Sequence, residues 1–97
     1  MWTGTLEFDL LLGDVHSLKE KRGIVRPIVA ELRRRFSVSA AEVDHLDLHR
    51  RAVIGMAVVG EGAAHVIEVL DTAERMMGER PEVELLSARR RLLNADE

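Results

Sequence analysis

The sequence predicts an α+β fold of the ferredoxin-like, split βαβ type, in which two helices cover one face of a four-stranded antiparallel sheet. Three observations lead to this prediction. Residues Trp2–Leu12 alternate between apolar and polar side chains, which is typical of a half-buried strand. Apolar residues recur at helical spacing in residues 18–36 and 63–77, and two strand-like runs separate these helices. With a last strand-like run, the order becomes βαββαβ, for which we expect the strand order 4-1-3-2.

The composition is that of one small domain. The chain has 97 residues, of which 46% are hydrophobic, and domains typically contain about 100–150 residues. There is no cysteine, which excludes disulfides, thiolate metal sites and a cysteine nucleophile. No apolar run approaches the roughly 20 residues that span a bilayer, and residues 1–5 lack the basic start of a signal peptide. We therefore expect a single ferredoxin-like domain over residues 1–97, located in the cytoplasm and without a membrane partner.

The first strand and the first helix carry the clearest local signals. In the strand, the even positions supply the buried face, with Leu6, Phe8, Leu10 and Leu12. Ser17 followed by Glu20 forms a capping box, which predicts that a helix begins here. Pro27 lies inside the helical pattern, where it removes a hydrogen bond. We expect a kink at Pro27, because the apolar stripe continues on both sides; the alternative is a separate first segment.

The second half of the chain repeats the pattern. Residues 38–44 and 52–59 are strand-like, and a polar segment joins them. The second of these runs is apolar at nearly every position, as expected for a central strand. The second helix follows and ends near Gly78, a common helix stop. After it, residues 83–93 form the last strand, which contains three consecutive arginines.

Positive charge is concentrated in the first helix. Residues 17–36 carry seven positive and two negative charges, a sum of +5, whereas residues 37–88 carry four and ten, a sum of −6. Exposed charges act over about 8–10 Å, so a basic element on an acidic body can form a local anion-binding face. The alternative is a solvated helix face paired with nearby carboxylates. The candidate RNA- or anion-binding residues are Lys19, Lys21, Arg22, Arg26, Arg33, Arg89, Arg90 and Arg91.

Lys21 differs from the other candidates because it lies on the apolar side of the helix. Two interpretations stay open. In the first interpretation, the long aliphatic stem of Lys21 lies on the core, and its ammonium group reaches solvent at the edge of the sheet. In the other interpretation, the ammonium binds an anion beside the first loop.

The open face of the third strand predicts an interaction surface of a different kind. It presents the candidate interface residues Val53, Gly55, Ala57 and Val59. None of them is aromatic, which argues against base stacking of the type seen in RNA-recognition motifs. An aliphatic open face suits a protein surface instead, such as a second copy of the same sheet. A homodimer is therefore the alternative to RNA binding.

The sequence contains only weak indications of an enzyme active site or a metal site. An acylphosphatase on this fold needs a glycine-rich phosphate cradle, and Gly13 is the single glycine of the first loop. The residues Asp44, His45, Asp47 and His49 are metal-ligand types, but their spacing matches no specific site. We predict no catalytic residue, no metal site and no cofactor.

Four segments in this order resemble the YlxP family of small bacterial proteins. They are Ser-Leu-Lys-Glu-Lys-Arg at 17–22, Ser-Ala-Ala-Glu-Val-Asp at 39–44, Arg-Ala-Val-Ile-Gly-Met-Ala at 51–57 and Glu-Val-Glu at 82–84. The resemblance extends from Trp2 to about Leu93 and implies a ferredoxin-like fold in a family of unknown function. Family genes commonly lie among those for translation initiation and ribosome maturation, which implies rRNA or a ribosome-assembly factor as a partner. His49 and Arg50 replace an expected tryptophan and glutamine, and Pro27 interrupts the long helix.

Taken together, these observations predict a non-enzymatic binding protein whose basic helix contacts the RNA backbone. A homodimeric interaction module that uses the open sheet face is the second hypothesis. A small acylphosphatase-like hydrolase is the third.

Overall fold

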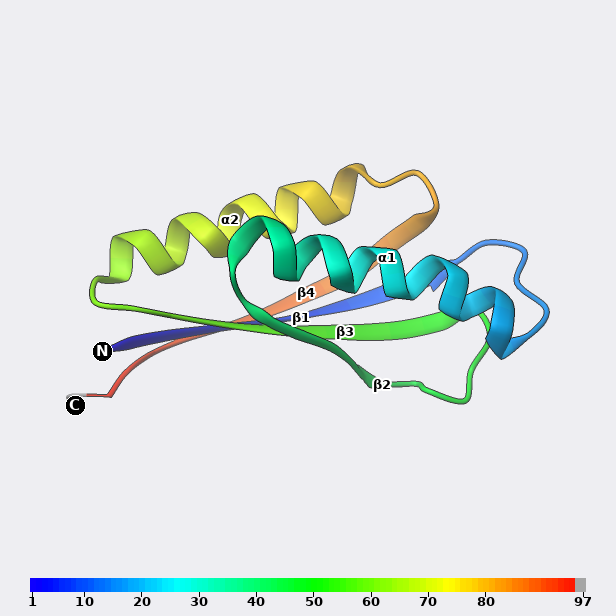
Figure 1. Ribbon diagram of the computed structural model, residues 1–97, viewed down its shortest axis with the longest axis horizontal. Helices are drawn as coiled ribbons and strands as arrows, with labels where there is room; N and C mark the ends of the chain where they lie inside the picture. Colours follow the sequence, from blue (N-terminus) through cyan, green and yellow to red (C-terminus); the bar gives the residue numbers. More distant parts are fainter. Residues whose placement is uncertain (96–97) are drawn as a thin grey trace.

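The computed structural model describes residues 1–95 and contains the expected six elements (Figure 1). In chain order they are β1 (Trp2–Leu12), α1 (Leu18–Phe36), β2 (Ser39–Asp44), β3 (Arg51–Gly60), α2 (Ala63–Glu79) and β4 (Val83–Asn94). The sheet has the order β2-β3-β1-β4, which is 4-1-3-2 counted from the other edge, and each pairing is antiparallel. Both helices lie on one face of the sheet (Figure 1). The ferredoxin-like prediction is confirmed.

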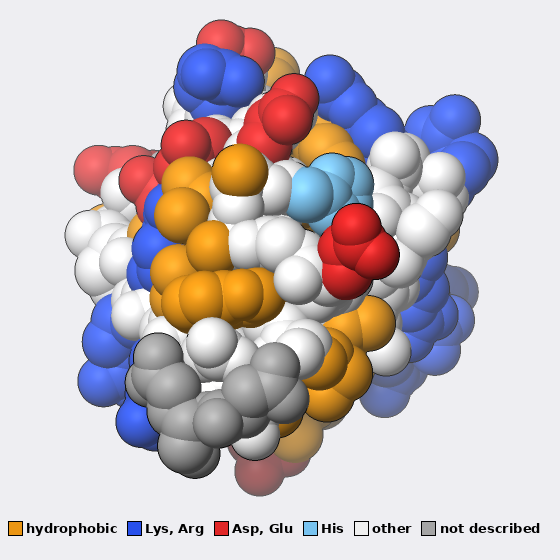
Figure 2. Space-filling view, turned by 90° about the vertical axis from the view of Figure 1, so that its left-hand side faces the viewer, with side chains coloured by type: hydrophobic (Ala, Val, Ile, Leu, Met, Phe, Trp, Pro, Cys, Tyr) orange, Lys and Arg blue, Asp and Glu red, His pale blue; other side chains and the backbone are white. Residues whose placement is uncertain are grey.

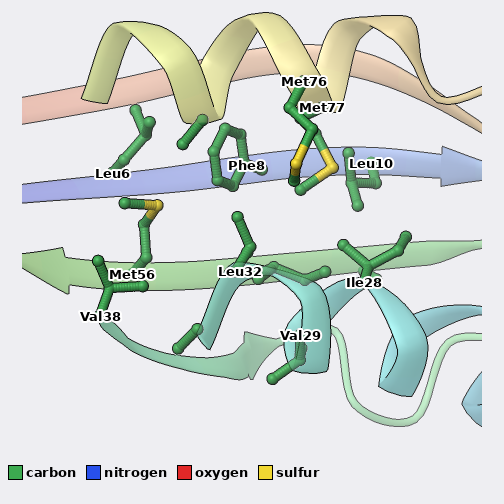
Figure 3. Packing of buried hydrophobic residues seen from close by; sticks show 14 of the residues in the cluster. Leu6, Phe8, Leu10, Ile28, Val29, Leu32, Val38, Met56, Met76 and Met77 are labelled. Carbon is green, nitrogen blue, oxygen red and sulfur yellow. The ribbon is translucent and has the colours of Figure 1, made fainter. Parts of the chain in front are cut away.

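The core lies between the sheet and the helices, and β1 is its centre. Leu6, Phe8 and Leu10 are fully buried. Figure 3 shows them with Ile28 and Leu32 from α1 and with Met76 and Met77 from α2. Among the described residues, no helix combines the length and the apolar character needed to cross a membrane.

Gly4 interrupts the apolar series of β1 for a steric reason. A Cβ atom at this position would lie 2.5 Å from Cγ1 of Val66 and 2.9 Å from Cδ1 of Leu70, both in α2. Such distances are too short for carbon atoms in contact. The glycine therefore lets α2 approach the strand closely.

The capping box at the start of α1 is present in a slightly extended form. The backbone N–H of Glu20 donates to Oγ of Ser17 at 3.1 Å. In return, Oε2 of Glu20 accepts from the backbone N–H of His16, one residue before the cap, at 2.9 Å. From there α1 continues as a single helix through Pro27, so the alternative of a separate first segment is wrong.

The end of β2 departs from regular pairing. The register shifts between Glu42 and Asp44, which leaves Val43 as the extra residue of a bulge. His45 follows with a φ angle of 57°, and the chain turns toward β3. Arg50 extends the ladder beyond β3, because its carbonyl accepts from the N–H of Leu12 at 2.8 Å.

Candidate functional site

Three basic side chains form an exposed row on α1, which we call the basic ridge: Lys19, Arg22 and Arg26. They are separated by three and four residues, so they share one side of the helix and span about 10 Å. All three residues are exposed, and their side chains form no hydrogen bond or ion pair with residues 1–95. The ridge therefore presents three unpaired positive charges to solvent.

A shallow hollow lies beside the basic ridge, and Gly23 and Pro27 complete its lining. Because Pro27 has no N–H, the carbonyl of Gly23 lacks the donor that a helix normally supplies four residues later. Gly23 is exposed and has no side chain to cover this carbonyl. A hydrogen-bond acceptor thus lies next to the cations of the basic ridge.

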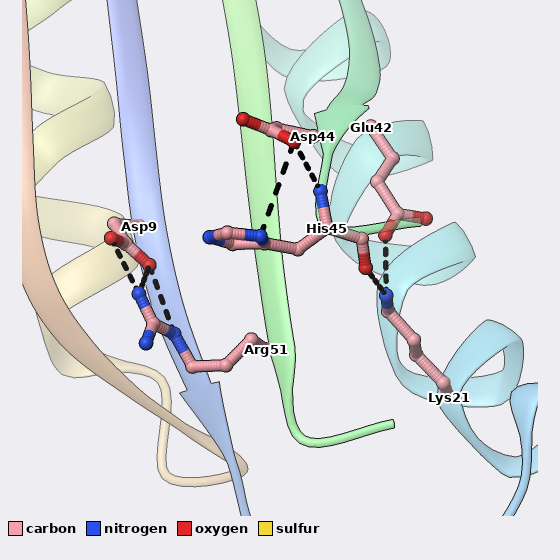
Figure 4. Close-up of polar contacts among 6 residues, drawn as sticks. All are labelled: Asp9, Lys21, Glu42, Asp44, His45 and Arg51. Carbon is pink, nitrogen blue, oxygen red and sulfur yellow. Dashed lines mark hydrogen bonds and ion pairs between the residues drawn. The ribbon is translucent and has the colours of Figure 1, made fainter. Parts of the chain in front are cut away.

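Lys21 does not join the basic ridge. Its side chain is buried, and Nζ lies 2.7 Å from Oε2 of Glu42 and 2.6 Å from the carbonyl oxygen of His45 (Figure 4). The side chain therefore ties α1 to the end of β2. The stem crosses to the sheet edge, as the first interpretation expected, but the ammonium does not reach solvent. We remove Lys21 from the anion-binding candidates, because its charge is neutralised inside the fold.

Arg33 occupies an intermediate position. Its Nε donates to the carbonyl oxygen of Ala40 in β2 at 3.0 Å. It lines a groove between α1 and β2, which we call the inner groove. Arg22 and Arg26 line the same groove from α1, so these two residues belong to both the basic ridge and the inner groove. Arg33 is thus partly engaged but still exposed.

The three arginines of β4 lie away from the basic ridge and also differ from one another. Nη1 of Arg90 lies 2.8 Å from Asp71 and Nη2 lies 3.5 Å from Glu74, both in α2. Arg89 and Arg91 are on the opposite face, where they are exposed and have no partner within residues 1–95. Because β2 and β4 are opposite edges of the sheet, about 14 Å separates these strands. The structure therefore does not bring the β4 arginines into one site with α1.

Fewer residues are accessible on the open sheet face than the four candidate interface residues suggested. Val53 is only 8% exposed. Its register partner Asp9 is held by Arg51, whose Nη2 lies 2.7 and 2.8 Å from the two carboxylate oxygens. Figure 4 shows this pair. Val53 is therefore covered within the monomer and does not belong to a free interface.

Gly55 is also partly covered, because a Cβ atom there would lie 3.0 Å from Cγ1 of Val43. Ala57 is half-buried, and Val59 is 61% exposed. Val59 and the exposed Leu93 flank Thr3 in register, at the end of the sheet near both chain ends. Figure 2 looks onto that end and shows hydrophobic side chains there, with basic side chains along the flanks.

The loops that suggested metal or phosphate chemistry have structural contacts instead. Within residues 1–95, no three His, Cys, Asp or Glu side chains converge in a way that could hold a metal ion. Oδ1 of Asp44 accepts from the backbone N–H of His45 at 2.7 Å. In the first loop, Nε of Arg50 donates to the carbonyl oxygens of Gly13 at 2.8 Å and Leu12 at 3.3 Å. This arginine therefore fastens the loop to the start of β3.

Sequence reasoning missed the inner groove and its residue Glu42. One signal was available, because Glu42 and Ala40 share parity in β2 and so both face the helices. An acidic side chain that faces the helices needs a cationic partner there. Lys21 is the basic residue on the apolar side of α1, so the pair could have been predicted.

Comparisons with known proteins identify a family and name no activity. One curated relative is a protein of Bacillus subtilis named "Uncharacterized protein YlxP", which is 28% identical over 81 residues. That match covers 84% of this chain and 88% of the relative. A family model with the description "Protein of unknown function (DUF503)" matches residues 3–90. The chain belongs to this DUF503 family.

Proposed function

We propose that the basic ridge binds phosphate groups of the RNA backbone and that the protein works, without enzymatic activity, in translation or ribosome maturation. The observation that supports this most is a contrast among the cations. Lys21, Arg51, Arg80 and Arg90 are paired with carboxylates. The basic ridge is unpaired, on a protein whose net charge is −3. Unpaired cations in a row suit a chain of phosphates, because neutralising phosphates releases their counterions.

Two further features favour RNA over other polyanions. The carbonyl of Gly23 beside the basic ridge, which lacks its i+4 helical donor because residue 27 is proline, can accept a hydrogen bond from a ribose 2′-hydroxyl, which DNA lacks. The resemblance to the YlxP family, whose genes commonly lie among those for translation initiation and ribosome maturation, points to rRNA. The partner class is therefore structured or single-stranded rRNA, bound through its backbone.

The test is fluorescence anisotropy with a labelled 20-nucleotide uridine RNA and a labelled rRNA hairpin. If the basic ridge contributes three phosphate contacts, the log–log salt slope is about −2, a loss of roughly 20-fold between 50 and 200 mM salt. Lys19→Gln, Arg22→Gln and Arg26→Gln together should abolish most of the binding and flatten this slope. The matched control replaces Arg75, Arg89 and Arg91 by Gln, with the same change in net charge. Equal losses in both triple variants, or salt-independent binding, contradict the proposal.

A second candidate function is a homodimeric module that uses the exposed end of the open sheet face. The exposure of Val59 and Leu93 on either side of Thr3 favours it. Sedimentation velocity tests it: a dimer that Val59→Glu dissociates supports the module, and a monomer at high concentration excludes it.

A further inference from the structure

The inner groove combines three features that no phosphate site requires. One wall is the free edge of β2, because β2 is an outer strand that, within residues 1–95, pairs only with β3. The other wall is α1, with Arg22, Arg26 and Arg33. Val25 and Val29, which are 4% and 8% exposed, line the space between them. The groove therefore has an apolar floor, a basic rim and a strand edge.

The strand edge offers both donors and acceptors. The contact from Nε of Arg33 to the carbonyl oxygen of Ala40 shows that this carbonyl points away from β3. In an antiparallel ladder, both polar backbone groups of such a residue face outward, and the pattern repeats every second residue. The N–H of Ala40 and that of Glu42 therefore face the groove side of β2. These are the groups to which an added strand pairs.

We propose that the inner groove binds an extended peptide segment of a partner protein, in which apolar residues alternate with acidic ones. The segment adds to β2 as a fifth strand, with main-chain hydrogen bonds to the edge. Because successive side chains of a strand point to opposite faces, its carboxylates face the arginines of α1 and its apolar side chains lie on the open face of the sheet, beside the exposed Val43. Strand addition of this kind is a general mode of peptide recognition. The inference goes beyond the proposed RNA contact and does not depend on it.

The charges exclude a second copy of the chain as the occupant. Pairing β2 with β2 of another copy would bring Arg22, Arg26 and Arg33 of both helices to one seam. Six guanidinium groups would then face each other, and like charges in such positions are destabilising. An acidic peptide has the complementary sign. RNA fits the groove less well, because its backbone has hydroxyl donors but no alternating N–H and C=O groups that could pair with a strand edge.

Arg33 has two roles in this arrangement. In the free protein its guanidinium covers the Ala40 carbonyl, which protects the exposed edge from nonspecific pairing. When a peptide strand arrives, a peptide N–H replaces Nε at that carbonyl. The guanidinium then pairs with a peptide carboxylate, and this new contact offsets the free energy lost when its hydrogen bond to the strand edge breaks.

The test uses fluorescein-labelled octapeptides that alternate Glu with Val, Leu or Phe, measured by anisotropy against the whole chain. At least one should bind, and its Lys-for-Glu counterpart should bind at least 10-fold more weakly. Methylating the backbone nitrogens that face β2 should abolish binding. Amide NMR should show the largest shifts at Ala40 and Glu42. No binding by any of the three probes, equal binding of the basic counterpart, or shifts elsewhere overturns the proposal.

Two variants separate this inference from RNA binding. Arg33→Gln should weaken the peptide at least 5-fold and leave the RNA within 2-fold, whereas Lys19→Gln should do the reverse. Ala40→Pro removes one outward N–H without breaking the ladder to β3, so it should abolish peptide binding while the RNA binds as before. If Ala40→Pro fails to fold, the methylated peptide tests the reciprocal bond of the same pairing, from a peptide N–H to the outward carbonyl of Ala40. Amide shifts at Ala40 and Glu42 on addition of the uridine RNA alone would overturn the assignment of the groove to a peptide.

Discussion

Replacing Lys21 by Met should destabilise the fold strongly, although the two side chains have similar length. Lys21 is 2% exposed, and its ammonium lies 2.7 Å from the carboxylate of Glu42. Removing one partner of a buried ion pair costs about 3–5 kcal/mol, because the other charge stays buried without compensation. The side chain of Glu42 is 18% exposed and can regain some water, so we expect the lower end, about 3 kcal/mol.

Thermal and urea unfolding followed by circular dichroism measure this effect. For a domain of this size, 1 kcal/mol corresponds to about 4–8 °C, so Lys21→Met should lower the Tm by about 12–24 °C. The matched control is the double variant with Met at both Lys21 and Glu42. It should lie within about 1–2 kcal/mol of the parent, because replacing a whole buried pair by apolar side chains is often neutral and the carbonyl of His45 loses one hydrogen bond.

The difference between the single and double variants isolates the pair. A double variant that is about 1–2 kcal/mol more stable than Lys21→Met alone supports the buried ion pair, and the single variant Glu42→Met completes the cycle from which the coupling free energy is calculated. Two results would refute the reasoning. In the first, Lys21→Met is as stable as the parent; in the second, the double variant loses as much stability as the single one.

Four other substitutions test the packing and the helix cap by urea unfolding. Gly4→Ala should cost about 1–3 kcal/mol, because its Cβ would lie 2.5 Å from Cγ1 of Val66; an unchanged midpoint would contradict the close approach of α2. Val53→Glu should cost about 2 kcal/mol, while Val59→Glu at a 61% exposed position should stay within about 0.5 kcal/mol; equal effects would mean that Val53 is not covered. Ser17→Ala should cost about 1 kcal/mol through loss of the cap, and no loss would mean that the cap is redundant.

The elements of the fold could be predicted because their signals are local. The alternation in β1 and the stripe in α1 each depend on residues a few positions apart, and the capping box spans four. The order of the strands then follows from the order of the elements. The sequence also contains the information that the three arginines of β4 lie on two faces of the sheet. Arg90 has the opposite parity to Arg89 and Arg91, so its side chain points to the other face.

The candidate site could be predicted only in part, because its contacts join distant segments. The pair between Lys21 and Glu42 depends on where β2 ends against α1, and a bulge at Val43 shifts that end. The burial of Val53 depends on a diagonal contact between Arg51 and Asp9 across two strands. A pattern of residue types gives the face on which a side chain lies, but it does not give the partner that covers it.

If both ligands bind as proposed, the basic ridge and the inner groove are coupled through Arg22 and Arg26, which line both. Each peptide carboxylate about 8 Å from a phosphate on the ridge repels that phosphate by about 0.5 kcal/mol in water. An acidic peptide in the groove therefore lowers the affinity of the ridge for RNA, and RNA lowers the affinity of the groove for the peptide by the same factor. Lys19 lines the hollow beside the basic ridge alone and Arg33 lines the inner groove alone, which is why single substitutions there should separate the two ligands.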